Sequence, residues 1–293
     1  MNIPADKKEK FIELFDHYVH SQQPRREFLQ NLVKAAGGVA AAAAVLPWLE
    51  GTGAEAAMVS PDDKRIEARM ESFVVGGAQM SAYVARPKGS QKLPAVIVIH
   101  ENRGLTAHIQ DVARRMAMEG FLAVAPDMLA PRGGTPKDRD RARKELYDMP
   151  KKEIASNLTA VSTFARGHAH STGSVGVVGF CWGGGASLDL AVMDPKLAAA
   201  VSYYGNAPKK GIEKINAAVL MNYAEDDPKR TKSVKPFAAA LKKLGKTGEL
   251  HFYPGTKHAF NNDARPARYH KVAAAEAWQR TVAYFKKHLK ASM

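Results

Sequence analysis

The stretch that decides the fold is Gly179-Phe180-Cys181-Trp182-Gly183-Gly184-Gly185, which lies between apolar runs at 174–178 and 186–193. A strand, a glycine–x–nucleophile–x–glycine turn and a helix in this order are typical of a nucleophile elbow, whose sharp turn strains the nucleophile's backbone. A side chain at either flanking glycine would collide with the neighbouring strand or helix. The helix N-terminus beneath the sulfur favours thiolate over thiol. The pattern therefore predicts that Cys181, the only cysteine, is a nucleophile and not an ordinary buried cysteine.

A cysteine nucleophile needs a base, and the base needs an orienting carboxylate. In this kind of fold the acid and then the histidine follow later strands in chain order. Apolar runs at 217–223 and 249–253 predict two such strands, and they lead into an acidic cluster at 225–227 and into His258. His258 is the candidate base and Asp227 the candidate orienter. A helix N-cap is the alternative role for the cluster, and two neighbours compete for the orienting role: Glu225 and Asp226.

These motifs resemble the dienelactone hydrolase family of α/β-hydrolases over roughly residues 65–290. The shared pieces are G-F-C-W-G-G at 179–184, Asp227, G-T-K-H-A-F at 255–260 and His100-Glu101-Asn102-Arg103-Gly104 after the apolar run 95–99. The spacing in that family selects Asp227 as the orienter. The resemblance implies a Cys-His-Asp triad that hydrolyses small esters or lactones. It also implies that Glu101 contacts the resting cysteine until substrate displaces it.

The oxyanion formed in such a reaction needs two backbone donors. We expect these to be the N–H groups of Asn102 and of Trp182, the residue after the nucleophile. Several side chains are expected to line the substrate pocket with Trp182, although core packing is an equal alternative for the last two: Arg103, Arg132, Tyr204 and Phe260.

One departure from the family pattern concerns the substrate. Family members that act on ring-cleavage lactones hold the substrate carboxylate with arginines, one of them four residues after the histidine, where this chain has Asn262. Arg132 lies near the second arginine position. Arg265 and Arg268 are either substitutes or surface residues. The sequence therefore predicts the chemistry and leaves the substrate open.

Alternating strand and helix patterns from residue 95 onward predict a mostly parallel eight-stranded sheet with helices on both faces. Only a short loop fits between the strands at 198–204 and 217–223, so no large cap domain is expected. The predicted strands are 69–75, 80–86, 95–99, 121–125, 174–178, 198–204, 217–223 and 249–253. The predicted helices are 106–119, 138–148, 151–166, 183–193, 229–244 and 268–289.

The first 56 residues differ in character from the hydrolase-like domain at 57–293. A short amphipathic helix at 7–21 precedes Arg25-Arg26, an alanine-rich apolar segment at 31–49 and the small-residue site Ala54-Glu55-Ala56. Paired arginines before such a segment predict a twin-arginine export signal, recognised by the twin-arginine machinery, and a periplasmic protein. The alternatives are a cytoplasmic N-terminal helix and a retained membrane anchor. A single cysteine excludes an intrachain disulfide.

The chain carries a net charge of +14, yet its basic residues are spread through helix-like stretches without interleaved aromatics. A solvated basic face is therefore favoured over a nucleic-acid interface. The histidines lack partners at metal-ligand spacing, so neither a metal nor another cofactor is predicted. The expected partner is a small-molecule ester or lactone. Two functions of other classes remain as alternatives, an exported binding protein and a thiol redox sensor, both on a hydrolase scaffold.

Overall fold

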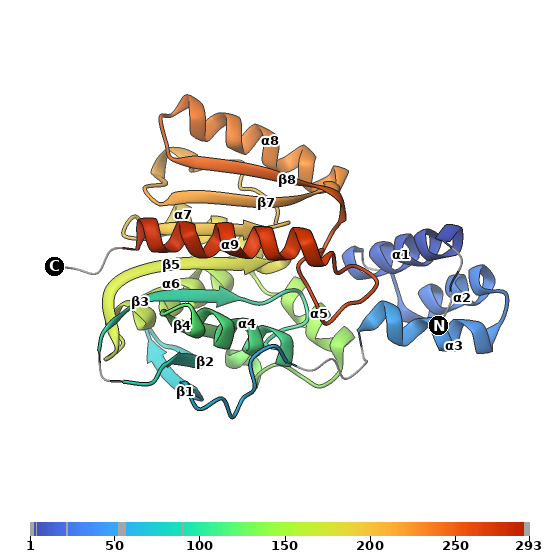
Figure 1. Ribbon diagram of the computed structural model, residues 1–293, viewed down its shortest axis with the longest axis horizontal. Coiled ribbons are helices and arrows are strands. Elements are labelled where there is room, and N and C mark those ends of the chain that lie inside the picture. Colours follow the sequence, from blue (N-terminus) through green and yellow to red (C-terminus); the bar gives the residue numbers. More distant parts are fainter. Residues whose placement is uncertain (1–2, 4, 22, 52–56, 90, 290–293) are drawn as a thin grey trace. The chain divides into compact units, whose positions relative to one another are not determined.

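The computed structural model describes residues 3, 5–21, 23–51, 57–89 and 91–289 (Figure 1). These residues divide into two compact units. The larger comprises 57–259 with 275–293, and the smaller comprises 1–56 with 260–274. We describe each unit by itself.

The larger unit is built on one eight-stranded sheet in the order β1-β2-β4-β3-β5-β6-β7-β8. β1 and β2 form an antiparallel hairpin, β2 is also antiparallel to β4, and the remaining neighbours are parallel. The predicted α/β fold is therefore confirmed. The strands are β1 (Ile66–Val75), β2 (Ala78–Pro87), β3 (Leu93–Ile99), β4 (Leu122–Asp127), β5 (Ser171–Phe180), β6 (Ala199–Tyr203), β7 (Ala218–Asp226) and β8 (Gly248–Lys257).

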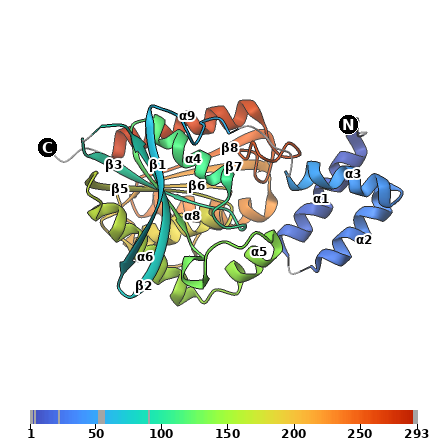
Figure 2. The same cartoon turned by 90° about the horizontal axis from the view of Figure 1, so that it is seen from below.

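Helices cover both faces of this sheet, and Figure 2 shows α4 and α9 on one side and α6 on the other. A single 3-10 helix, η2 (Ile212–Lys214), occupies the connection between β6 and β7, so the expected absence of a large cap there matches the structure. The other helical elements of this unit are α4 (Ala107–Met118), η1 (Ala130–Arg132), α5 (Arg139–Tyr147), α6 (Lys151–Gly167), α7 (Trp182–Met193), α8 (Pro228–Lys243) and α9 (Lys271–His288).

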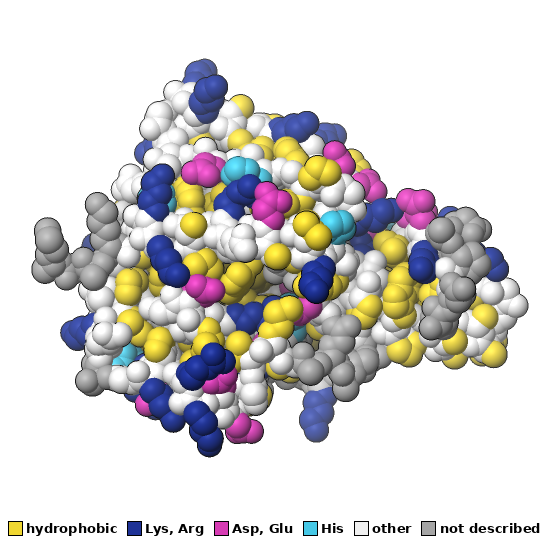
Figure 3. Space-filling view, in the orientation of Figure 1, with side chains coloured by type: hydrophobic (Ala, Val, Ile, Leu, Met, Phe, Trp, Pro, Cys, Tyr) yellow, Lys and Arg dark blue, Asp and Glu magenta, His cyan; other side chains and the backbone are white. Residues whose placement is uncertain are grey.

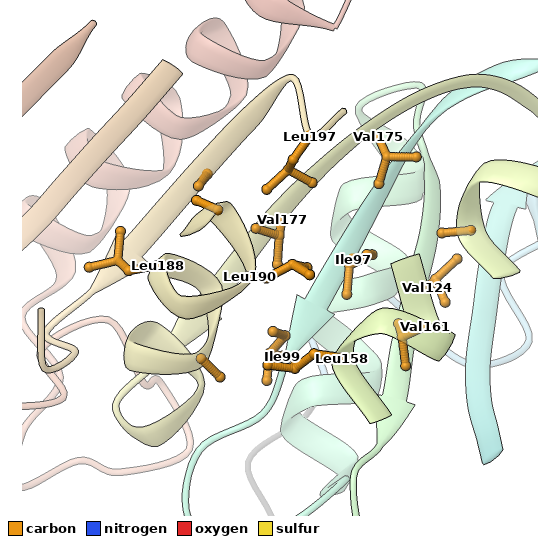
Figure 4. Packing of buried hydrophobic residues seen from close by; sticks show 14 of the residues in the cluster. Ile97, Ile99, Val124, Leu158, Val161, Val175, Val177, Leu188, Leu190 and Leu197 are labelled. Carbon is orange, nitrogen blue, oxygen red and sulfur yellow. The ribbon is translucent and has the colours of Figure 1, made fainter. Parts of the chain in front are cut away.

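The two helical layers follow from the alternation of side chains along the buried strands. On β5, Val175 and Val177 face a cluster that includes Leu158 of α6 and Leu188 of α7 (Figure 4). Between them Gly176 faces the opposite side, where an added Cβ would lie 2.8 Å from Phe285 of α9. The central strands are therefore buried on both faces, which holds the loops at their carboxyl ends in fixed positions.

In the described part of residues 1–56, three helices share a core of their own. They are α1 (Ala5–His20), α2 (Arg25–Ala36) and α3 (Val39–Glu50). The rings of Tyr18 and Phe28 stack with centroids 4.6 Å apart. Around this stack pack further buried side chains: Phe11, Phe15, Leu32, Ala42, Val45 and Leu49. The amphipathic helix expected at 7–21 corresponds to α1.

The apolar segment expected at 31–49 is not one continuous element. It breaks at Gly37 and Gly38, whose φ angles are 85° and 149°. Among the described residues no single helix is long and apolar enough to span a membrane; α2 and α3 reach that threshold only as a pair, and they are bent by 114°. The expected cleavage site Ala54-Glu55-Ala56 lies outside the described residues.

Residues 260–274 belong to this smaller unit, which the sequence patterns do not predict. Ala267 packs against the helical core. The guanidinium of Arg268 forms an ion pair with Asp16 and donates to the carbonyl oxygen of Ile12 at 3.3 Å. Arg268, considered above as a substitute for a substrate-binding arginine, therefore has a carboxylate partner on α1.

Basic side chains are dispersed over the face of the molecule shown in Figure 3, with acidic side chains between them. The lysines and arginines that give the chain its net charge of +14 therefore do not form one patch on that face.

Candidate active site

The turn between β5 and α7 has the geometry of a nucleophile elbow. Cys181 has φ 54° and ψ −110°, a conformation that a residue with a Cβ rarely adopts. An added Cβ at Gly179 would lie 1.9 Å from the carbonyl oxygen of Gly183, and one at Gly183 would lie 2.4 Å from that of His100. Both flanking positions therefore require glycine. The elbow holds Cys181, 5% exposed, at the N-terminus of α7.

His258 and Asp227 meet at the same edge of the sheet. His258 follows β8 and Asp227 follows β7, and His258 Nδ1 lies 2.7 Å from Asp227 Oδ2. The second oxygen of Asp227 accepts the N–H of Arg230 at 3.2 Å and so caps α8. The orienting role and the N-cap, which the sequence left as alternatives, are thus compatible in one side chain.

The two competing carboxylates are engaged elsewhere. Glu225 accepts the N–H of Gly255 at 3.1 Å, and Asp226 pairs with Lys257 at 3.4 Å. Asp227 is therefore the member of the acidic cluster that contacts His258. The ring of His258 also packs against Tyr204, with centroids 4.9 Å apart.

The loop after β3 is fixed against the elbow by His100. Its Nε2 accepts the N–H of Met128 at 3.2 Å, so the proton of the neutral ring lies on Nδ1, which donates to the carbonyl oxygen of Glu101 at 2.7 Å. Burial lowers the pKa of His100, which keeps the ring neutral. The ring of His100 also stacks on that of Trp182, with centroids 5.7 Å apart. Glu101 and Asn102, 6% and 1% exposed, are therefore held in a rigid buried loop beside the start of α7.

The N–H groups expected to form the oxyanion hole come from this loop and from α7. Trp182 is the first residue of α7, and the first N–H groups of a helix lack an acceptor within the helix. Asn102 is additionally positioned by its side chain, which donates to the hydroxyl of Tyr147 at 3.4 Å. The arrangement is compatible with two backbone donors near Cys181.

A cavity of about 240 Å³ opens beside Cys181. Tyr204 and Phe260, expected to line the pocket, are fully buried and are not on its wall. The lining residues are Tyr147, Ile154, Cys181, Trp182, Gly185, Ala186, Asp189, Asn206, Ala207, Pro208 and Arg230.

The two arginines expected in the pocket are also not on the wall of this cavity, because each has a carboxylate partner elsewhere. Arg103 pairs with Asp140 at 2.9 Å, and Arg132 forms a two-contact pair with Glu153 at 2.6 and 2.8 Å. Sequence reasoning missed Arg230, which does line the cavity. A usable signal was its place in the first turn of α8, where the helix dipole disfavours a cation.

No cluster of three or more His, Cys, Asp or Glu side chains in the described part of the chain is arranged to hold a metal ion.

Comparison with known proteins decides the family. The profile of the dienelactone hydrolase family matches residues 80–289. The chain belongs to the dienelactone hydrolase family. A protein of Escherichia coli named as a candidate carboxymethylenebutenolidase is 35% identical over 246 residues, which cover 78% of this chain and 90% of the relative. A similarly named protein of Salmonella typhi is 35% identical over 245 residues, with the same coverage.

Solved structures agree. The crystal structure of a candidate dienelactone hydrolase from Klebsiella pneumoniae shares 34% identity and a TM-score of 0.68, and the match covers 76% of this chain and 99% of that one. A dienelactone hydrolase from Anabaena variabilis, 19% identical with a TM-score of 0.61, shows the shared fold. This dienelactone hydrolase family member is thus a hydrolase acting on esters or lactones. Residues 1–79 lie outside the family match.

Proposed function

We propose that the chain hydrolyses small esters or lactones through a Cys181–His258–Asp227 triad. The observation that carries the proposal is the strained backbone of Cys181, with φ 54°, between two glycines that no other residue can replace. Such strain persists only where the surrounding structure enforces it, and it clusters at functional sites.

The proposed reaction has two steps. Sγ of Cys181 attacks the carbonyl carbon as the thiol proton passes to Nε2 of His258, while Asp227 holds Nδ1–H at 2.7 Å. The N–H groups of Asn102 and Trp182 bind the resulting oxyanion. His258 then gives its proton to the leaving alcohol oxygen, and a thioester with Cys181 remains. Water, deprotonated by His258, attacks this thioester; the C–S bond breaks, the acyl group leaves as a carboxylic acid, and His258 returns its proton to the sulfur.

Glu101 has a supporting role in this proposal, on the basis of the family resemblance. Its carboxylate would contact the resting cysteine, be displaced by substrate and assist ionisation of the thiol. The structure supports this role by holding Glu101 in the buried loop that packs against the elbow.

We also propose that the precursor is exported to the periplasm by the twin-arginine machinery. The support is the sequence pattern of Arg25-Arg26, the apolar segment and the small-residue site. The mature enzyme would begin near Ala57, where the larger unit begins.

The reaction is tested by Cys181→Ala, measured on an activated aryl ester. We expect kcat/KM to fall by about a thousandfold or more, because the nucleophile is lost, while the melting temperature stays near that of the wild type.

A second measurement uses iodoacetamide, which has a single cysteine to modify. Activity should disappear in step with alkylation of Cys181, and substrate should slow both. Full activity in the alanine variant would refute the triad. A wild-type protein that hydrolyses nothing but binds esters, or that forms a reversible sulfenic acid coupled to a partner, would favour the two alternatives.

A further inference from the structure

A buried guanidinium lies on the wall of the cavity beside Cys181. Arg230, 6% exposed, donates from Nε to the carbonyl oxygen of Tyr204 at 3.2 Å and from Nη1 to Oδ1 of Asn206 at 2.5 Å. Both acceptors are neutral. Among the described residues Nη2 has no hydrogen-bond partner, and this nitrogen is in contact with solvent. Because Arg230 lines the cavity, this nitrogen is a donor that the protein leaves over for a ligand there.

Arg230 also differs from three of the arginines that the sequence brought into consideration. Arg103, Arg132 and Arg268 are each paired with a carboxylate of the chain, namely those of Asp140, Glu153 and Asp16. In the described structure Arg230 forms no such pair. The nearest acid in sequence, Asp227, directs its oxygens to His258 and to the backbone N–H of Arg230. Asp189, on the same cavity wall, forms no ion pair with Arg230 either.

An unpaired buried charge is costly, and the first turn of α8 is an unfavourable place for a cation. A pre-positioned guanidinium that opens into a cavity recovers that cost when an anion binds, because a charge-assisted pair forms in a partly dehydrated site. Its two bonds to neutral oxygens fix its orientation without neutralising it. The charge is thus available to a ligand and held in one place beside the nucleophile.

We propose that Arg230 binds a carboxylate of the substrate and so makes the enzyme selective for anionic esters or lactones. This inference rests on the proposed hydrolysis by Cys181. It places the anion site at the start of α8, with Asn206 as its support, and not on the loop after β8, where Asn262 stands. The carboxylate belongs either to the acyl part or to the leaving group, and the two arms of the experiment distinguish these cases.

The experiment uses rigid substrate pairs that differ by one charge. For the acyl side, mono-4-nitrophenyl terephthalate, whose second carboxylate is free, is compared with methyl 4-nitrophenyl terephthalate, in which that carboxylate is esterified. For the leaving-group side, 4-acetoxybenzoate is compared with its methyl ester. The measured quantity is the ratio of kcat/KM for the anionic member to that for the neutral one. The variants are Arg230→Gln and Arg230→Lys, and the matched control is Lys229→Gln, which removes an exposed charge from the adjacent position.

In Arg230→Gln we expect the ratio to fall about tenfold to a hundredfold on one of the two sides, because a hydrogen bond to a charged group is lost. Arg230→Lys should keep part of the preference, since it keeps the charge without the fork of donors. Lys229→Gln should leave the ratio unchanged. A purely structural role for Arg230 predicts that both members of a pair lose the same factor, and an unchanged ratio in Arg230→Gln would overturn the proposal.

A binding measurement separates this inference from the proposed function. In Cys181→Ala, terephthalate monoamide is titrated by calorimetry, with Arg230 intact and with Arg230→Gln. Binding that weakens at least several-fold in the double variant supports the anion site, even if the wild type hydrolyses none of the esters and the proposed function fails. Equal binding in both proteins refutes the anion site, even if Cys181 proves to be the nucleophile. If Arg230→Gln does not fold, the lysine variant decides by the same criteria.

Discussion

The elbow at 179–185 and the helical leader at 25–50 both depend on glycines, but the glycines differ in what surrounds them. In the elbow, added Cβ atoms at Gly179, Gly183 and Gly184 would lie 1.9, 2.4 and 2.5 Å from backbone oxygens. In the leader, Gly37 and Gly38 have nothing within 4 Å of that position. The elbow glycines are therefore required by close packing. The leader glycines permit a break between two helices without enforcing it.

This difference yields the largest expected effect, in a comparison of Gly183→Ala with Gly37→Ala. The new methyl group of Gly183→Ala would meet two backbone carbonyls, of His100 and Ile99, which cannot rotate away. We expect a loss of more than about 4 kcal/mol in the free energy of unfolding, or failure to fold. Gly37→Ala places a Cβ in open space at φ 85° and should cost only about 1–2 kcal/mol, confined to the leader.

Denaturant unfolding of the two variants, followed by near-UV circular dichroism, measures both effects. A third variant, Gly167→Ala, serves as the control, because Gly167 has neither a positive φ nor any atom within 4 Å of an added Cβ. Its stability should match the wild type. A Gly183→Ala protein as stable as Gly167→Ala would show that the elbow tolerates a side chain and that its glycines are not obligatory.

The same contrast explains what the sequence could predict. The elbow was predictable because local sterics determine it, and the eight strands were predictable because apolar runs alternate with helical patterns. Asp227 required the family spacing, since its neighbours have the same chemistry. The place of residues 260–274 could not be predicted, and for Arg230 the sequence offered no more than its position in the first turn of a helix, because both roles depend on which distant groups they meet. Arg268 meets Asp16 on α1, while Arg230 meets only neutral oxygens.

The leader offers a second test, which distinguishes the role of its arginine pair in export from the role of Arg25 in holding the helices together. Arg25 pairs with Glu50 at 2.8 Å, so the pair has both a structural contact and a proposed role in export. Arg25→Lys combined with Arg26→Lys keeps the charges but removes the guanidinium groups that the export receptor recognises. We expect the precursor to accumulate uncleaved in the cytoplasm, with periplasmic protein reduced by about tenfold or more, since receptor recognition is lost.

The matched control for this test is Glu50→Gln, which removes the partner of Arg25 and leaves both arginines in place. Export should continue. Cell fractionation and mass spectrometry of the N-terminus distinguish the outcomes, and the mature form should begin near Ala57. Undiminished export of the double lysine variant would contradict the twin-arginine prediction, and an intact residue 1 on exported protein would instead indicate a retained anchor.

The smallest expected effect concerns Glu101. Its proposed role matters for both the leader and the elbow, because the leader sets the compartment in which the elbow cysteine must survive. If the leader directs the enzyme to an oxidising compartment, a permanently ionised thiol at the elbow would be oxidised readily. A carboxylate beside the resting Cys181 would suppress the thiolate by like-charge repulsion and would assist ionisation once substrate moves it. Glu101→Gln should therefore change two rates in opposite directions. Alkylation of the resting thiol by iodoacetamide should become faster, and kcat should fall about tenfold with a smaller change in KM.

Asp226→Asn, which alters an exposed carboxylate paired with Lys257, is the control and should change neither rate. A variant in which alkylation and turnover both stay at wild-type values would remove Glu101 from the mechanism. A fall in both rates would show that it supports the loop without masking the thiol, because the loss of a negative neighbour cannot by itself make the thiol less reactive.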